Sequence, residues 1–213
     1  MGPGARGAII AACAWSLVSC GPKTLVLPEE PVERAATCGA VTAASARSAT
    51  VVGTPLSLES IGRVLHYPML AASAGQTFSA DAAEAVQTRM SELQDTISER
   101  KWQDLIPACK AAFPATGVEE VTLPSDRFVA QLGCDELGDF LGSSLEAKDE
   151  YLNELSEYRG LRSKLESSVT SGLRSRAGRD PEAHQEERRK ALATMAKKGP
   201  PVAVMRACLE RFG

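Results

Sequence analysis

The sequence predicts an all-α protein made of two tandem four-helix units, each closed by a disulfide. The chain is rich in Ala, Leu, Glu, Arg and Ser and poor in aromatic residues, a composition that favours helices. Its apolar residues recur three and four positions apart, the spacing that places them on one helix face. Its Val and Ile residues form no alternating runs, and a cysteine stands near each end of each predicted unit.

The N-terminal segment has the layout of a secretory signal peptide. One positive charge, Arg6, precedes an apolar run from Ala8 to Trp15. This run is too short to cross a bilayer as a helix, which needs about 20 apolar residues. The residues that follow it, Leu17-Val18-Ser19-Cys20, resemble the lipobox of bacterial lipoproteins.

The lipobox resemblance implies a lipid anchor in the bacterial cell envelope. It implies that residues 1–19 are removed and that Cys20 becomes an acylated, diacylglyceryl-modified N-terminus. Gly21 follows the cysteine where an Asp would favour the inner membrane, so the resemblance points to the outer membrane, facing the periplasm. Two alternatives stay open, a buried first helix of a cytosolic protein and a plain signal peptide cut nearby. Gly21-Pro22 would break such a helix.

Residues 20–36 are predicted to form a lipidated tether. The segment holds three prolines and several acidic residues. Such a composition favours an extended, semi-rigid chain of about 3 Å per residue.

Residues 37–114 are predicted to form the first helical unit. Its boundary signals are a start near Cys38, a cap and proline at Thr54-Pro55, an N-cap at Ser79 and a stop at Pro114. Pro68 is expected to kink or divide the second helix.

A linker over residues 115–124 is predicted to precede the second unit, residues 125–213. Its boundary signals are Ser125-Asp126, a capping box of Ser143 and Glu146, a cap and proline at Asp180-Pro181, and a break at Gly199-Pro200-Pro201. The capping box is expected to begin the longest helix, whose buried seam is Tyr151 or Leu152, then Leu155, Tyr158, Leu165 and Val169.

The two units resemble one unit written twice. The pattern Ala-Cys-x-x-x-Phe occurs at residues 108–113 and again at residues 207–212, and the same shift of 99 residues aligns Leu93 with Leu192. Together with the matching order of helices and cysteines, this pattern predicts an internal duplication.

Four cysteines remain once the signal is removed and Cys20 is lipidated. An even number in an oxidising compartment predicts two disulfides. The duplication favours Cys38–Cys109 and Cys134–Cys208, separated by 71 and 74 residues. Loops of this length stabilise a protein by at most roughly 4 kcal/mol per bridge. The alternative is four free thiols that pack as small hydrophobic side chains.

Charge is divided unevenly along the chain. Residues 20–158 carry 21 acidic and 10 basic side chains, whereas residues 159–213 carry 6 acidic and 13 basic ones. The basic part could contact an anionic lipid or polysaccharide. Alternatively, basic helices face acidic ones within the fold or form a solvated surface.

Catalytic motifs are absent from the sequence. Neither His66 nor His184 belongs to a Glu-x-x-His pair, and no nucleophile elbow, phosphate-binding glycine loop or dinucleotide fingerprint occurs. The cysteines lack the spacing of zinc sites. We therefore expect no metal or cofactor and assign no catalytic residue.

Four side chains are candidates for contact with a partner. Trp102 could stack on a partner or glycan, although it could instead complete the core one turn before Leu105. Arg188, Arg189 and Lys190 could bind phosphate groups at the envelope, or could form a solvated helix face.

The expected function is that of a non-enzymatic envelope lipoprotein whose helical surface binds another protein or an envelope polymer. One alternative is a carrier or sensor with a small-ligand pocket inside one helical bundle. A further alternative is an enzyme whose cleft gathers His66 or His184 with carboxylates and a hydroxyl from distant parts of the chain. Nucleic acid is not expected as a partner of an exported protein, and the sequence predicts no oligomeric state.

Overall fold

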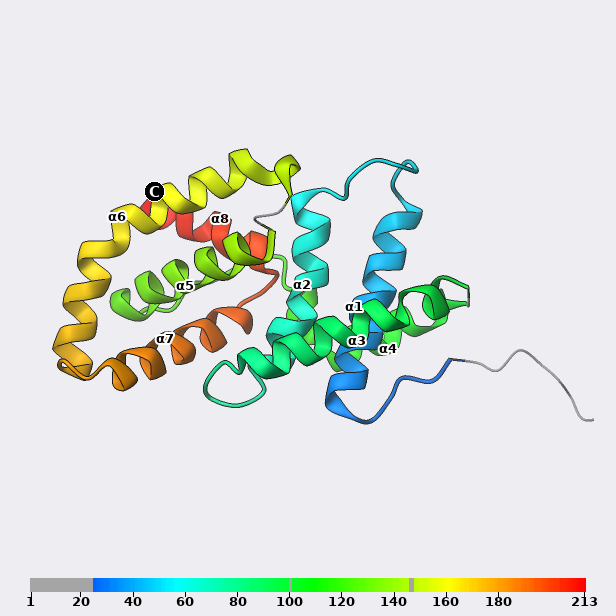
Figure 1. Cartoon of the computed structure of the whole chain (residues 1–213), viewed down its shortest axis with the longest axis horizontal. Coiled ribbons are helices and arrows are strands. Elements are labelled where there is room, and N and C mark those ends of the chain that lie inside the picture. The colour runs from blue at the N-terminus through cyan, green and yellow to red at the C-terminus, as the bar shows by residue number, and fades with distance from the viewer. Residues whose placement is uncertain (1–24, 100, 146–147) are drawn as a thin grey trace, which may run out of the picture.

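The computed structural model describes residues 25–99, 101–145 and 148–213, and this part of the chain contains helices and no strands. The first unit comprises α1 (Pro31–Ser48), α2 (Leu58–Ala72), α3 (Ala80–Ser98) and α4 (Ile106–Ala112). The second comprises α5 (Arg127–Leu145), α6 (Leu152–Ala177), α7 (Pro181–Ala196) and α8 (Pro201–Phe212). Short 3-10 turns lie at η1 (Trp102–Leu105), η2 (Pro114–Gly117) and η3 (Asp149–Tyr151). The predicted fold class is confirmed (Figure 1).

Both units are built around their first helix. α1 contacts α2, α3 and α4, and α5 contacts α6, α7 and α8. The disulfides Cys38–Cys109 and Cys134–Cys208 join the first helix of each unit to its last, so the predicted pairing is confirmed. A shared arrangement of this kind is what an internal duplication predicts.

The predicted tether of residues 20–36 is wrong in its C-terminal part. α1 begins at Pro31 and buries Ala35 and Ala36 completely. Pro31 occupies the first turn of a helix, where a proline is favoured. Glu30 caps this helix by accepting hydrogen bonds from the backbone N–H groups of Val32 and Glu33. Residue 20 lies outside the described residues.

The packing of Leu25 and Leu27 also differs from what an extended tether predicts. Both are partly buried and pack against the core of the first unit. Residues 25–30, which form no regular helix, therefore lie along the folded body.

Two other boundary predictions are wrong, and Pro68 does not divide the second helix. Ser57, rather than Thr54-Pro55, caps α2, and Pro68 lies inside this continuous helix. Ser143 lies within α5, because the burial of Leu141 and Leu145 carries this helix past the predicted cap.

The two units pack against each other through α2. This helix contacts α7 and α8, and a Cβ at Gly62 would lie only 2.5 Å from the Val202 side chain. Met69 and Phe78 of the first unit belong to the core cluster of the second. The two units therefore form one continuous body.

None of the described helices is both long enough and apolar enough to cross a membrane.

Candidate ligand-binding site

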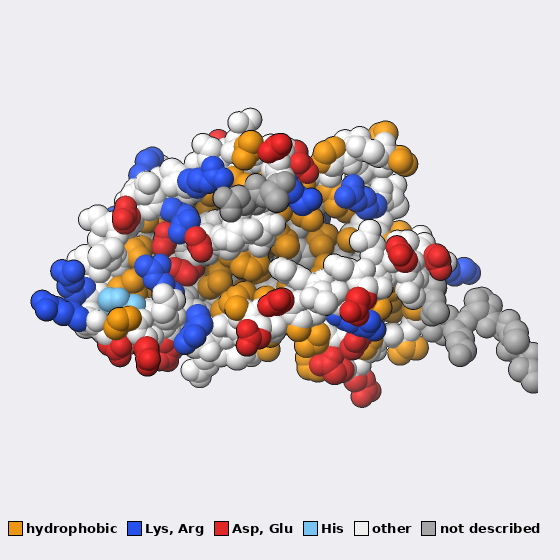
Figure 2. All heavy atoms as spheres, in the orientation of Figure 1, with side chains coloured by type: hydrophobic (Ala, Val, Ile, Leu, Met, Phe, Trp, Pro, Cys, Tyr) orange, Lys and Arg blue, Asp and Glu red, His pale blue; other side chains and the backbone are white. Residues whose placement is uncertain are grey.

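A cavity of about 480 Å³ opens between helices of the first unit. Its size lies within the range of about 300–1,000 Å³ that small-molecule sites occupy. α1, α2 and α3 line it together with Leu56 and Trp102 from the adjoining segments. Figure 1 shows α1, α2 and α3, the helices that contribute its lining, and Figure 2 shows apolar side chains in this part of the surface.

Small side chains on α1 create the cavity. A Cβ at Gly39 would lie 2.6 Å from the Met90 side chain, so α1 and α3 approach closely at this point. The next residue, Ala40, and, one turn later, Ala43 and Ala44 line the cavity. Because an alanine fills little of the space between helices, this stretch leaves a hollow where larger residues would close the core.

The cavity has an apolar wall and a polar wall. Leu56, Val64 and Trp102 contribute buried apolar surface. The polar wall lies on α3 and consists of Gln87, Ser91, Gln94 and Ser98. These positions are spaced four, three and four residues apart, which places them in one stripe along the helix.

Arg47 is the only charged residue among the described residues that line the cavity. It stands exposed in the last turn of α1, and its Nη1 donates a hydrogen bond to the carbonyl oxygen of Thr54 at 3.3 Å. Within the described chain, no carboxylate lies within ion-pair distance of its guanidinium. The cavity therefore carries at its edge one positive charge that has no ion-pair partner among the described residues.

The second unit supports one wall of the cavity. The hydroxyl of Tyr151, in η3, donates a hydrogen bond to the carbonyl oxygen of Leu56 at 2.5 Å. Burial raises the pKa of this hydroxyl, so it stays protonated and can donate. The contact fixes the loop before α2 at the position where Leu56 faces the cavity.

Trp102 does not lie on the surface as a partner contact would require. Only 9% of its surface is exposed, and it packs in the core cluster that contains the Cys38–Cys109 disulfide. Its side chain faces the cavity instead.

The predicted basic run is largely neutralised within the fold. Arg188 pairs with Asp135 at 3.2 Å and with Glu136, and Lys190 pairs with Glu186 at 2.8 Å and Glu187 at 3.2 Å. Arg189 is exposed and forms no ion pair with the described residues. Two of the three predicted basic contacts therefore have partners inside this chain.

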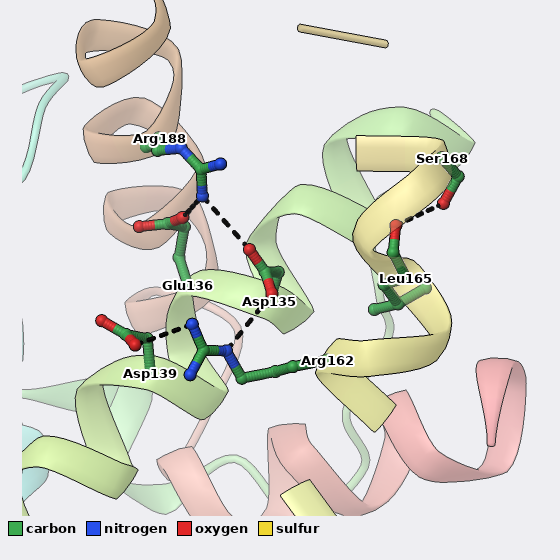
Figure 3. A network of polar contacts seen from close by, with 7 residues as sticks. All are labelled: Asp135, Glu136, Asp139, Arg162, Leu165, Ser168 and Arg188. Carbon is green, nitrogen blue, oxygen red and sulfur yellow. Dashed lines mark hydrogen bonds and ion pairs between the residues drawn. The ribbon is translucent and has the colours of Figure 1, made fainter. Parts of the chain in front are cut away.

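Arg188 belongs to a network that links three helices of the second unit. Arg162 of α6 pairs with Asp135 at 3.3 Å and with Asp139 at 2.7 Å, as Figure 3 shows. Arg188 approaches Asp135 and Glu136 from α7. The network thus holds α6 and α7 against α5.

Neither histidine belongs to the cavity lining. His66 is completely buried, and its Nε2 lies 2.7 Å from the carbonyl oxygen of Ala196 in α7. Burial lowers its pKa to about 4. His184 Nε2 lies 3.0 Å from the carbonyl oxygen of Gly178. Within the described residues, no group of three potential metal ligands occurs.

Among the residues that line the cavity, the sequence prediction singled out only Trp102. The signal that could have revealed the site is the spacing of Ala40, Ala43 and Ala44, which places three small side chains on one face of α1. A stripe of alanines on a helix predicts close packing as readily as a hollow. The sequence pattern alone therefore does not identify the cavity.

No family model, no curated protein and no solved structure matches this chain.

Proposed function

We propose that this protein is an exported, lipid-anchored binding protein that holds a small, largely apolar ligand in the cavity of its first unit. The observation that carries the proposal is the cavity itself, which combines a buried apolar wall with a few polar groups. This combination is typical of small-molecule sites.

The placement of the predicted contact residues supports a ligand inside the bundle over a partner on its surface. Trp102 faces the cavity, and Arg188 and Lys190 are paired with acidic side chains of the same chain. Most of the side chains that favoured a surface partner therefore make their contacts within this chain.

The two disulfides support export. Disulfides persist in oxidising compartments and are rare in the cytosol. An oxidising compartment is also where the lipobox resemblance at Leu17-Val18-Ser19-Cys20 directs the chain. We propose on these grounds that residues 1–19 are removed, that Cys20 carries the lipid, and that the body faces the periplasm from the outer membrane.

Intact-mass measurement of the protein from its native host tests the anchor. We expect loss of residues 1–19 and an added mass of diacylglycerol and a fatty acyl group at Cys20, both of which Cys20→Ser should abolish. Recovery of the wild-type chain with residues 1–19 attached and no acyl group would contradict export by this route.

Ligand binding is tested with the neutral fluorophore N-phenyl-1-naphthylamine. We expect saturable binding to the full chain and loss of that binding in Ala44→Leu, because the larger side chain fills the cavity. Ala111→Leu is the matched control, since Ala111 is an exposed alanine on α4 outside the cavity lining. Equal binding by both variants would show that the fluorophore does not occupy the cavity.

A second candidate function is favoured by the charge at one end of the molecule. Figure 2 shows Lys and Arg side chains gathered where α6 and α7 meet, and Arg174, Arg176 and Arg179 are exposed there. Arg176 pairs with Asp126 at 2.6 Å, which leaves Arg174 and Arg179 without an ion pair among the described residues. This end could contact an anionic envelope polymer.

Co-sedimentation with lipopolysaccharide tests the second candidate. The double variant Arg174→Glu, Arg179→Glu should lower the fraction of protein that sediments, because the substitution reverses the local charge. Lys110→Glu, at an exposed position of α4 in the first unit, is the matched control. Equal sedimentation of both variants with the wild type would exclude a contact at this end.

A further inference from the structure

Building on the proposed function, we infer that the ligand of the cavity is an amphiphile with one aliphatic chain and a single anionic head group, and that Arg47 binds the head group. The inference joins two observations. The apolar and polar walls of the cavity are separate, and the positive charge of Arg47 at its edge has no ion-pair partner in the described part of the chain.

The charge of the site favours an anion. Arg47 is the only charged residue among the described lining residues, so a cationic head group would meet repulsion without any compensating carboxylate. A carboxylate placed beside Arg47 gains charge-assisted hydrogen bonds, which are about twice as strong as neutral ones. The guanidinium uses Nη1 for the Thr54 carbonyl, and its planar fork offers further donors for two parallel hydrogen bonds.

The walls favour an aliphatic chain for the rest of the ligand. Leu56, Val64 and Trp102 offer apolar contact on one side, and Ala40 and Ala44 form the α1 side. Burial of each methylene group against such a surface contributes about 0.8 kcal/mol. A sugar could pair its hydroxyl groups with the polar wall on α3, but those turned towards the apolar wall would stay unpaired, which is costly.

The position of Arg47 fits the orientation of such a ligand. It lies in the last, exposed turn of α1, while Ala40, two turns earlier, is buried. A chain that lies along α1 therefore places its head group at the exposed edge and its tail in the buried part of the cavity.

Fluorescence of Trp102 tests this inference directly. The sequence contains two tryptophans, and Trp15→Phe in the full chain leaves Trp102, on the cavity wall, as the sole emitter. The probes are decanoate, 1-decanol and decyltrimethylammonium, which share one chain and differ in head-group charge. We expect a saturable change with decanoate and at least about tenfold weaker binding of the ammonium compound.

Substitution of Arg47 separates the contribution of the head group to binding from that of the aliphatic chain. Arg47→Gln should weaken the binding of decanoate roughly tenfold and leave the binding of 1-decanol unchanged, because only the charged contact is lost. Arg174→Gln, an exposed arginine of the second unit, is the matched control and should alter neither. Circular dichroism of each variant checks that the fold is retained.

Two further probes distinguish the source of the anionic head. Saturable binding of decanoate assigns a free fatty carboxylate, whereas binding only of 1-decanoyl-lysophosphatidylglycerol, which also carries one chain, assigns the head group of a lipid. Failure of both to bind would overturn the inference.

The outcomes also separate this inference from the proposed function. If N-phenyl-1-naphthylamine binds but decanoate and decyltrimethylammonium bind equally well, or Arg47→Gln leaves decanoate unchanged, the anionic ligand is wrong and the cavity remains a binding site. If the neutral fluorophore and all the chain-bearing probes fail to bind, the proposed function fails with it.

Discussion

His66 shows how a single buried side chain can make stability depend on pH. Its imidazole is completely buried at the contact between the two units, and its Nδ1 has no hydrogen-bond partner in the described structure. Burial lowers its pKa to about 4, although the hydrogen bond with the Ala196 carbonyl raises it in part. The neutral ring is therefore the form that the fold requires.

We predict that acid weakens the fold through His66. The pKa of an unfolded histidine is about 6.5, so between this pH and pH 4 the unfolded chain binds a proton that the folded chain does not. The contribution of His66 to stability is therefore fully present above pH 6.5 and is lost as the pH falls towards 4, by up to about 3 kcal/mol. Urea unfolding at a series of pH values measures the effect.

His66→Gln is the control for this prediction. The glutamine amide can still donate a hydrogen bond to Ala196 but does not titrate. The difference in unfolding free energy between wild type and variant should fall from pH 6.5 to pH 4. A difference that is constant over this range would show that His66 is not the group responsible.

At the scale of elements, the second unit depends on charged contacts between helices. Arg188 of α7 forms ion pairs with Asp135 and Glu136 of α5, and both of these carboxylates are largely buried. Burial raises the pKa of Glu136 despite this contact, because removal of the carboxylate from water disfavours its charged form. Arg188 therefore offsets a desolvation penalty as well as joining two helices.

We predict that Arg188→Met lowers the free energy of unfolding by about 1–3 kcal/mol, because it leaves two largely buried carboxylates with less compensation. Lys190→Met on the same helix should cost less, since Lys190 pairs with Glu186 and Glu187 in more exposed surroundings than those of Arg188. Chemical denaturation of both variants measures the two losses. Equal losses would show that the network acts only as a surface contact.

The helix boundaries show which features a sequence can specify. Ser79 caps α3, Asp180 caps α7 with Pro181 at its first position, and Gly199 separates α7 from α8, all as predicted. These signals act within one turn of the chain. The Ser143 signal failed because burial of Leu141 and Leu145, a tertiary effect, decides where α5 ends.

The candidate site was largely beyond prediction from sequence. The cavity is lined by segments from Ala40 to Trp102, and its volume depends on how three helices are placed relative to one another. The Arg188–Asp135 pair joins residues 53 positions apart. The disulfides could be predicted because the repeat related the two pairs of cysteines.

At the scale of the whole molecule, the contact between the units decides whether they unfold together. The core cluster of the second unit includes Met69 and Phe78 from the first, and α2 lies against α7 and α8. Loss of either unit would expose this shared apolar surface. We therefore expect one cooperative transition for the whole body.

Removal of the second disulfide tests this coupling. In the full chain with Trp15→Phe, we predict that Cys134→Ala with Cys208→Ala destabilises the protein by at most roughly 4 kcal/mol, the entropy contribution of a loop of this length. Trp102 lies in the other unit, beside Cys38–Cys109, yet its fluorescence should report the same lowered midpoint as circular dichroism, because the first unit loses part of its buried surface when the second unfolds. An unchanged Trp102 midpoint beside an earlier loss of helix would show that the units unfold independently and that α2 does not couple them.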